Sequence, residues 1–124
     1  ARIEVVVTRL LILQKMERWH MGAEIARGAV RGWPECPDLY ILGAYAIRRA
    51  EDVRAALEFL RSGEPCMADV ANYWFNMACY HSQLGDLDEA RTYVKKAVGL
   101  DKGFRMMALE DADLEPLWEE LGRA

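Results

Sequence analysis

Apolar residues recur at helical spacing along most of the chain, in blocks that short polar turns separate. In the first block the recurring positions are Ile3, Val6, Leu10 and Leu13. Residues three and four apart share one face of a helix, so these four form a packing stripe. The same kind of block returns until the C-terminal tail. The pattern therefore predicts an all-α protein built from six main helices and a short helical tail.

Proline and glycine mark several of the expected helix boundaries. Pro37 suits the first turn of a helix, since its missing N–H would be unpaired there anyway. Gly63 followed by Pro65 ends the fourth helix, because proline cannot continue one. Gly85 suits a tight left-handed turn, and we expect the carboxylate of Asp86 to cap the helix that follows.

Similar residues return at an interval of 34 positions. The small residues of this series are Gly22, Ala56 and Ala90, and the large residues three positions earlier are Trp19, Val53 and Leu87. Tyr40 and Trp74 keep the same interval, as do Ala44 and Ala78. Small residues let helix backbones approach closely, and large ones fill the space beside them. Each copy is therefore expected to be a pair of antiparallel helices joined by a short turn.

The third copy, residues 71–104, resembles a tetratricopeptide repeat. The matching residues are Trp74, Asn76, Met77, Ala78, Gly85, Asp86, Ala90, Ala97 and Val98. Residues 3–36 and 37–70 match more loosely, and Glu51 stands where the family usually has Gly. The tail, residues 105–124, is similar to a capping segment of some bacterial repeats of this family. The resemblance implies a single domain over residues 1–124, folded as a right-handed α-solenoid (a superhelix of stacked helix pairs).

Composition narrows the function further. The chain has 124 residues, with 16 Lys and Arg against 20 Asp and Glu, for a net charge of −4. A nucleic-acid partner would require a basic face, so none is expected. The first apolar run is too short and too charged to cross a bilayer, so no membrane partner is expected either. Three cysteines without a CxxC pair favour a reducing cytoplasm over a disulfide framework.

In the family that the third copy resembles, the first helix of each pair lines a concave groove that holds a peptide or helix of a partner protein. Helical spacing then gives these candidate partner-binding residues: Gln14, Lys15, Tyr45, Arg48, Arg49, Asn72, Phe75, Asn76, Cys79 and Gln83. Asn can bind an extended backbone, and Arg can hold a carboxylate through two hydrogen bonds. The alternative is that both Arg side chains are solvated or paired with nearby acids, and that Tyr45 and Phe75 are packing residues.

We therefore predict a non-enzymatic protein-interaction module. The alternative is a small chaperone of the same fold, similar to those of type III secretion, which covers an aggregation-prone helical subunit. Catalysis is not expected, since His20 and His81 are the only histidines and fall in different copies. No metal or cofactor is expected: the motif at Asp111, Asp113 and Glu115 lacks the glycine of a calcium loop.

The first helix is apolar on nearly every side. Besides its packing stripe it carries Val5, Val7, Leu11 and Ile12. Such a helix is normally buried on more than one side. We expect it to pack against a partner chain, a second copy in a homo-oligomer, or an upstream helix.

Overall fold

The computed structural model describes residues 2–123, and every regular element among them is helical. The elements are α1 (Ile3–Lys15), α2 (Trp19–Gly32), α3 (Pro37–Ala50), α4 (Val53–Arg61), the 3-10 turn η1 (Glu64–Cys66), α5 (Ala71–Gln83), α6 (Leu87–Leu100), α7 (Phe104–Glu110), the 3-10 segment η2 (Ala112–Leu117) and α8 (Trp118–Arg123). The all-α prediction and the six main helices are confirmed. None of the helices in the described part is both long enough and apolar enough to cross a bilayer.

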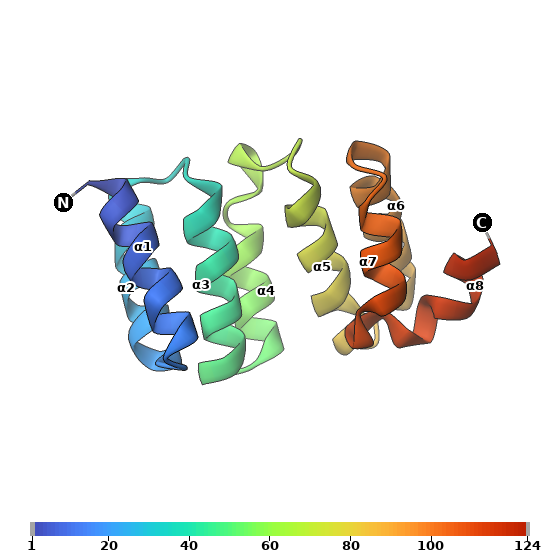
Figure 1. Ribbon diagram of the computed structural model, residues 1–124, viewed down its shortest axis with the longest axis horizontal. Coiled ribbons are helices and arrows are strands. Elements are labelled where there is room, and N and C mark those ends of the chain that lie inside the picture. The colour runs from blue at the N-terminus through green and yellow to red at the C-terminus, as the bar shows by residue number, and fades with distance from the viewer. Residues whose placement is uncertain (1, 124) are drawn as a thin grey trace. The chain divides into compact units, whose positions relative to one another are not determined.

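Residue contacts divide the chain after Met67 into two compact units. Unit 1 holds α1 to α4, in which α2 packs on α3, α3 on α4, and α1 on both α2 and α3. Unit 2 holds α5 and α6, packed on each other, together with α7, η2 and α8. Within each unit, consecutive main helices run in opposite directions, as the 34-residue pattern predicts (Figure 1).

Small residues bring the helices of unit 1 close together. Gly43 of α3 is buried, and a Cβ atom built there would lie 2.5 Å from the Cβ of Ala26 and 2.7 Å from the ring of Phe59. Gly22, at the first position of the small-residue series, is buried too, with Ala46 as its nearest neighbour. The expected close approach of helix backbones is thus confirmed.

Two turns of the same kind join α1 to α2 and α5 to α6. In the second turn, the N–H of Gly85 donates to the Ser82 carbonyl and that of Asp86 donates to the His81 carbonyl. Gly85 has a φ of +87°, as predicted, so the turn is a Schellman motif. The prediction that Asp86 caps α6 with its carboxylate is wrong, because that carboxylate lies 3.4 Å from the Nδ1 of His81 instead.

The first of these turns has the same pair of hydrogen bonds around a different residue. Glu17 donates to the Gln14 carbonyl, and Arg18 donates to the Leu13 carbonyl. Glu17 occupies the left-handed position with a φ of 55°, a conformation that side chains other than glycine rarely adopt.

The tail is divided where the spacing of Leu114, Leu117, Trp118 and Leu121 predicts a single helix capped by Asp111 or Asp113. In the structure η2 and α8 share that segment. Of the two candidate caps it is Asp111 that begins η2, by accepting a hydrogen bond from the N–H of Asp113. Leu114 and Leu117 are fully buried, which fixes η2 against α5. Pro116 lies inside η2 and lacks the N–H that a regular helix would use, which explains the break.

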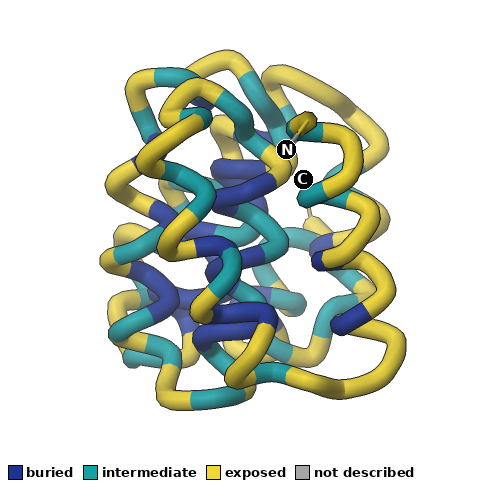
Figure 2. Tube along the Cα trace, turned by 90° about the vertical axis from the view of Figure 1, so that its left-hand side faces the viewer, coloured by how far each residue is buried: buried dark blue, intermediate teal, exposed yellow. Residues whose placement is uncertain are grey.

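The first helix is buried on one side only. Leu10 and Leu13 are buried, whereas Val5, Leu11 and Ile12 are each about half exposed. Figure 2 shows the trace from the N-terminus as largely exposed, interrupted by short buried segments. The predicted packing stripe is therefore confirmed, and the opposite side of α1 is an apolar surface of unit 1.

Candidate functional site

A groove of about 660 Å³ lies on unit 1, against α1, α2 and α3. Its lining residues are Thr8, Leu11, Ile12, Gln14, Lys15, Glu17, Trp19, Tyr45 and Arg49. We call it the unit 1 groove. Four of the residues predicted from helical spacing meet in it: Gln14, Lys15, Tyr45 and Arg49. On the α1 side, the apolar Leu11 and Ile12 lie among Thr8, Gln14 and Lys15. The start of α2 and the end of α3 supply an aromatic and cationic side with Trp19, Tyr45 and Arg49.

Trp19 organises the aromatic side of the groove. Its ring meets that of Tyr45 edge to face, with the ring centroids 5.5 Å apart and the planes at 76°. Arg49 follows Tyr45 by one helical turn, and its guanidinium carbon lies 5.0 Å from the centroid of the Trp19 ring. Two residues of one face of α3 therefore hold a single indole, which limits the freedom of all three side chains.

The charged groups of the groove are Lys15, Glu17 and Arg49, all of them exposed. Among the described residues, neither Lys15 nor Arg49 has an acidic partner within ion-pair distance. By contrast, Arg27 of α2, outside the groove, is paired, because Glu51 accepts two hydrogen bonds from it at 2.6 and 3.2 Å. These bonds hold the pKa of the Glu51 carboxyl below its ordinary value.

Arg48 also lies on α3 but does not line the groove. Its side chain is half-buried and engaged with other parts of the protein, unlike that of its exposed neighbour Arg49. The two arginines that the sequence grouped together thus have different surroundings.

The remaining predicted residues lie on α5 in unit 2, and their surroundings divide them into two groups. Asn72 and Gln83 are exposed, and Asn76 is half-buried. The amide of Asn76 donates to the carbonyl of Asn72 at 2.8 Å and to its side-chain oxygen at 3.1 Å, so it is already used within the helix.

Phe75 and Cys79 form the second group, and both are buried. The ring of Phe75 packs on that of Phe104 in α7, with centroids 5.1 Å apart. About two turns further on, the Ser82 hydroxyl donates to the backbone carbonyl of Asp113 at 2.6 Å. The tail of the chain itself therefore covers this face of α5, so Phe75 and Cys79 are packing residues of unit 2.

Cys79 is close to two acids of the tail. The ligand atoms of Cys79, Asp111 and Asp113 all lie within 4.8 Å of one another. Calcium prefers about six to eight oxygen ligands, and this cluster offers two carboxylates and a thiol. The Asp111 carboxylate accepts the N–H of Asp113 at 2.9 Å, which gives it a structural role at the start of η2.

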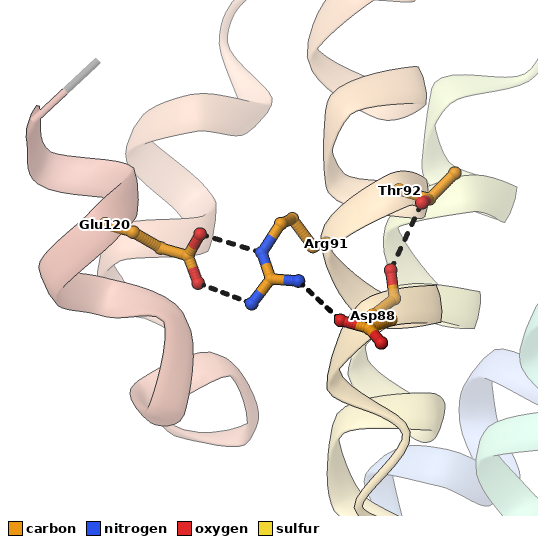
Figure 3. A network of polar contacts seen from close by, with 4 residues as sticks. All are labelled: Asp88, Arg91, Thr92 and Glu120. Atoms are coloured by element: carbon orange, nitrogen blue, oxygen red, sulfur yellow. Dashed lines mark hydrogen bonds and ion pairs between the residues drawn. The ribbon is translucent and has the colours of Figure 1, made fainter.

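Arg91 ties the last helix to α6 (Figure 3). It donates to the two carboxylate oxygens of Glu120 in α8 at 2.7 and 2.9 Å, and to Asp88 at 2.8 Å. The hydrogen bonds from Arg91 lower the pKa of the Glu120 carboxyl and raise the pKa of Arg91 itself. The Arg105 side chain adds a bond to the Leu121 carbonyl, so α8 is held largely by polar contacts.

Residues 71–104 match the tetratricopeptide-repeat family over their whole length. This segment is similar to a tetratricopeptide repeat. The match coincides with the third copy predicted from the 34-residue spacing, and it comprises α5, α6 and the Schellman turn at Gly85. Among curated proteins, none matches this chain in sequence.

Two solved structures have the same fold as this repeat-containing chain. One is PcrH in complex with the chaperone binding region of PopD, with 18% identity and a TM-score of 0.71 over 98% of this chain and 86% of that chain. The other is PcrH in complex with the chaperone binding region of PopB, with 18% identity and a TM-score of 0.71 over 97% of this chain and 91% of that chain. At this identity the likeness shows a shared fold.

Five lining residues of the unit 1 groove are outside the predicted set: Thr8, Leu11, Ile12, Glu17 and Trp19. Trp19 belongs to the large-residue series of the repeat and was assigned to packing, yet its ring is only partly buried and forms a wall of the groove. The available signal was the position of Glu17, since it stands 34 residues before Glu51 and 68 before Gly85, at a turn where these repeats use glycine.

Proposed function

We propose that this chain is a non-enzymatic module that binds a peptide or helix of a partner protein in the unit 1 groove. One observation carries the proposal: a groove of about 660 Å³ brings apolar residues of α1 together with the Trp19, Tyr45 and Arg49 cluster. Exposed apolar surface beside aromatic and Arg side chains is typical of the centre of a protein interface. Binding of a peptide by PcrH on the same fold supports it further.

The two histidines support a role without catalysis. His81 is 5% exposed and packs against the ring of Tyr93, so it belongs to the core of unit 2. His20 is exposed on α2, where it lines a cavity of about 330 Å³ with Trp19 and Arg49 but without a second histidine or a cysteine. Neither lies among the residues of the unit 1 groove.

Site-specific photo-crosslinking in the source cell tests the proposal. A benzophenone side chain at Ile12, inside the groove, is expected to crosslink a partner polypeptide. The same probe at Arg31, exposed on α2 and outside the groove, is the matched control. The crosslinked segment should be recovered with no mass change beyond the crosslink. Equal crosslinking from both positions, or a chemically altered segment, would contradict the proposal.

A chaperone is the second candidate, favoured by the amount of exposed apolar surface on unit 1. Val5, Leu11, Ile12 and Met16 are each about half exposed along α1. A chaperone would keep its bound segment dispersed, whereas a scaffold would leave the segment's solubility unchanged. Light scattering of the crosslinked partner, produced with and without this chain, separates the two: aggregation only in its absence would identify a chaperone.

The outer side of α1 also supports self-association as part of this proposal. A second cavity of about 420 Å³ lies there, lined by Glu4, Val5, Thr8, Arg9, Ile12 and Leu13. Concentration-dependent light scattering of the chain and of a Val5→Glu variant tests it. A monomer at every concentration would exclude the homo-oligomer.

We further propose a cytoplasmic location, without nucleic-acid or membrane partners, from the acidic charge and from three cysteines that form no disulfide.

A further inference from the structure

We infer that the unit 1 groove selects acidic segments, in which Asp or Glu side chains lie next to an aliphatic or aromatic one. The inference rests on the proposed function, because it names the chemistry of the segment that the groove binds. The carboxylates concerned are side chains within the partner, so a free chain end is not required.

The charge of the groove is opposite to that of the whole chain. Lys15 and Arg49 bring two positive charges to the lining, against one negative charge from Glu17. The chain as a whole carries −4. Within the described residues both cations lack an acidic partner, so they are available to a ligand. An acidic ligand is repelled by most of the protein surface and attracted here, which gives both specificity and orientation.

Arg49 is already held in a geometry that suits a carboxylate. Its guanidinium stacks over Trp19 at 5.0 Å, and that indole is in turn fixed by Tyr45. This cation–π contact uses none of the guanidinium N–H groups, so they can still donate two hydrogen bonds to a carboxylate. Because the side chain is ordered before binding, less rotational freedom is lost when the ligand arrives.

Apolar residues of α1 explain why the ligand also needs an apolar side chain. Leu11 and Ile12 are 48% and 53% exposed, and both line the groove. An aliphatic or aromatic side chain of the ligand would remove this surface from water. The ligand thus needs an apolar residue and an acidic residue within a few positions of each other, as on one face of an amphipathic helix.

Glu17 works against this selectivity and so provides an independent test. Its carboxylate lines the groove with Lys15 and Arg49, at the strained position of the first Schellman turn. Removal of this negative charge alone should strengthen the binding of an acidic ligand. A ligand held only by apolar contacts would respond little to the same change.

The test uses random 12-residue peptides displayed on phage and fused through their C-termini, so that no peptide has a free C-terminal carboxylate. The wild-type chain should enrich peptides that combine Asp or Glu with an apolar residue. A Lys15→Glu, Arg49→Glu variant should enrich Lys and Arg instead, and should bind the leading wild-type peptide about tenfold more weakly or worse. Glu17→Gln should bind that peptide more tightly than the wild type does.

Three controls make the outcomes distinct. Arg31→Glu with Arg54→Glu gives the same change of net charge at exposed positions outside the groove, and should leave the selection unchanged. Circular dichroism shows whether the variant with both charges reversed is folded. If it is not, Arg49→Gln removes one positive charge with a smaller change of structure. Leu11→Glu replaces an apolar lining residue of the groove, so it should weaken the binding of any peptide that binds there.

Two results would overturn the inference and leave the proposed function intact. In the first, the enriched peptides depend on Leu11 but are not rich in Asp or Glu. In the second, the charge-reversed variant enriches the same peptides as the wild type. Peptides that bind Leu11→Glu as well as they bind the wild type, or no enrichment at all, would overturn both.

Discussion

The Ser82 hydroxyl donates a 2.6 Å hydrogen bond to the backbone carbonyl of Asp113, which lies 31 positions further along the chain. Ser82 is 7% exposed, so this bond forms in the interior of unit 2. It fixes the start of η2 against the end of α5. The tail is therefore an integral layer of unit 2, and its loss should be measurable as a loss of stability.

We expect Ser82→Ala to lower the free energy of unfolding by about 1 kcal/mol, the usual contribution of a buried hydrogen bond. Chemical denaturation measures the change, and hydrogen exchange of the Leu114 amide should report η2 opening. Ser62→Ala is the matched control, because its hydroxyl also donates to a carbonyl at 2.6 Å but on an exposed surface. Equal effects of the two substitutions would contradict a structural role for the η2 contact.

The link between Arg91 and Glu120 should make the attachment of α8 depend on pH. Hydrogen bonds from Arg91 lower the pKa of Glu120 in the folded protein below its ordinary value of 4.5. A lowered folded pKa means that the link stabilises the fold above pH 4.5 and is lost as the pH falls through the folded pKa. Trp118 belongs to the same helix as Glu120, and its indole N–H donates to the Ala108 carbonyl of α7, so its fluorescence reports on the attachment of α8.

Glu120→Gln is expected to loosen α8 at neutral pH, so that its Trp118 fluorescence differs from that of the wild type. The two proteins should converge as the pH falls below the folded pKa, because the wild-type carboxyl is then neutral too. A difference that stays constant across this pH range would show that the carboxylate charge does not hold α8.

Glu17→Gly should stabilise the protein. Glu17 has a φ of 55°, a conformation that costs most side chains about 1–2 kcal/mol and costs glycine nothing. Part of this gain is offset by the greater freedom of glycine in the unfolded chain, so we expect a net gain of about 0.5–1 kcal/mol by chemical denaturation. Glu17→Gln removes the charge and keeps the strain, so it serves as the control. No advantage of Gly over Gln would contradict the prediction.

Gly43→Ala should destabilise unit 1. A Cβ at this position would meet Ala26 at 2.5 Å and Phe59 at 2.7 Å, so α2 or α4 would have to shift. Overpacking of this kind costs about 1–3 kcal/mol. Gly28→Ala is the control within the same unit, since nothing lies within 4 Å of its Cβ position. It should stabilise α2 by up to about 1 kcal/mol, and a similar loss in both variants would contradict the packing argument.

The sequence was sufficient for the helices, their pairing and the third repeat, because spacing and small residues report directly on helix faces and close approach. It was insufficient to predict which other segments of the chain pack on each helix face. Phe75 and Arg49 lie on corresponding faces of α5 and α3, yet Phe75 is buried under the tail of unit 2 and Arg49 is exposed on unit 1. That difference depends on where Phe104 and η2 fold, a tertiary contact that local spacing does not encode.

Capping was the second point on which the sequence was insufficient. Asp86 precedes a helix just as Asp52 does, but only Asp52 accepts a hydrogen bond from its helix, at 2.8 Å from the N–H of Ala55. His81 lies next to the Asp86 carboxylate and provides another partner. A propensity for capping therefore gives way where a tertiary neighbour competes for the same oxygen atoms.

The position of the tail has a consequence for the surface of the repeat. In unit 2, α7 and η2 lie against α5 and α6. Another helix pair could stack at this place only if it displaced α7 and η2, which would break the Ser82–Asp113 hydrogen bond and expose Leu114 to water.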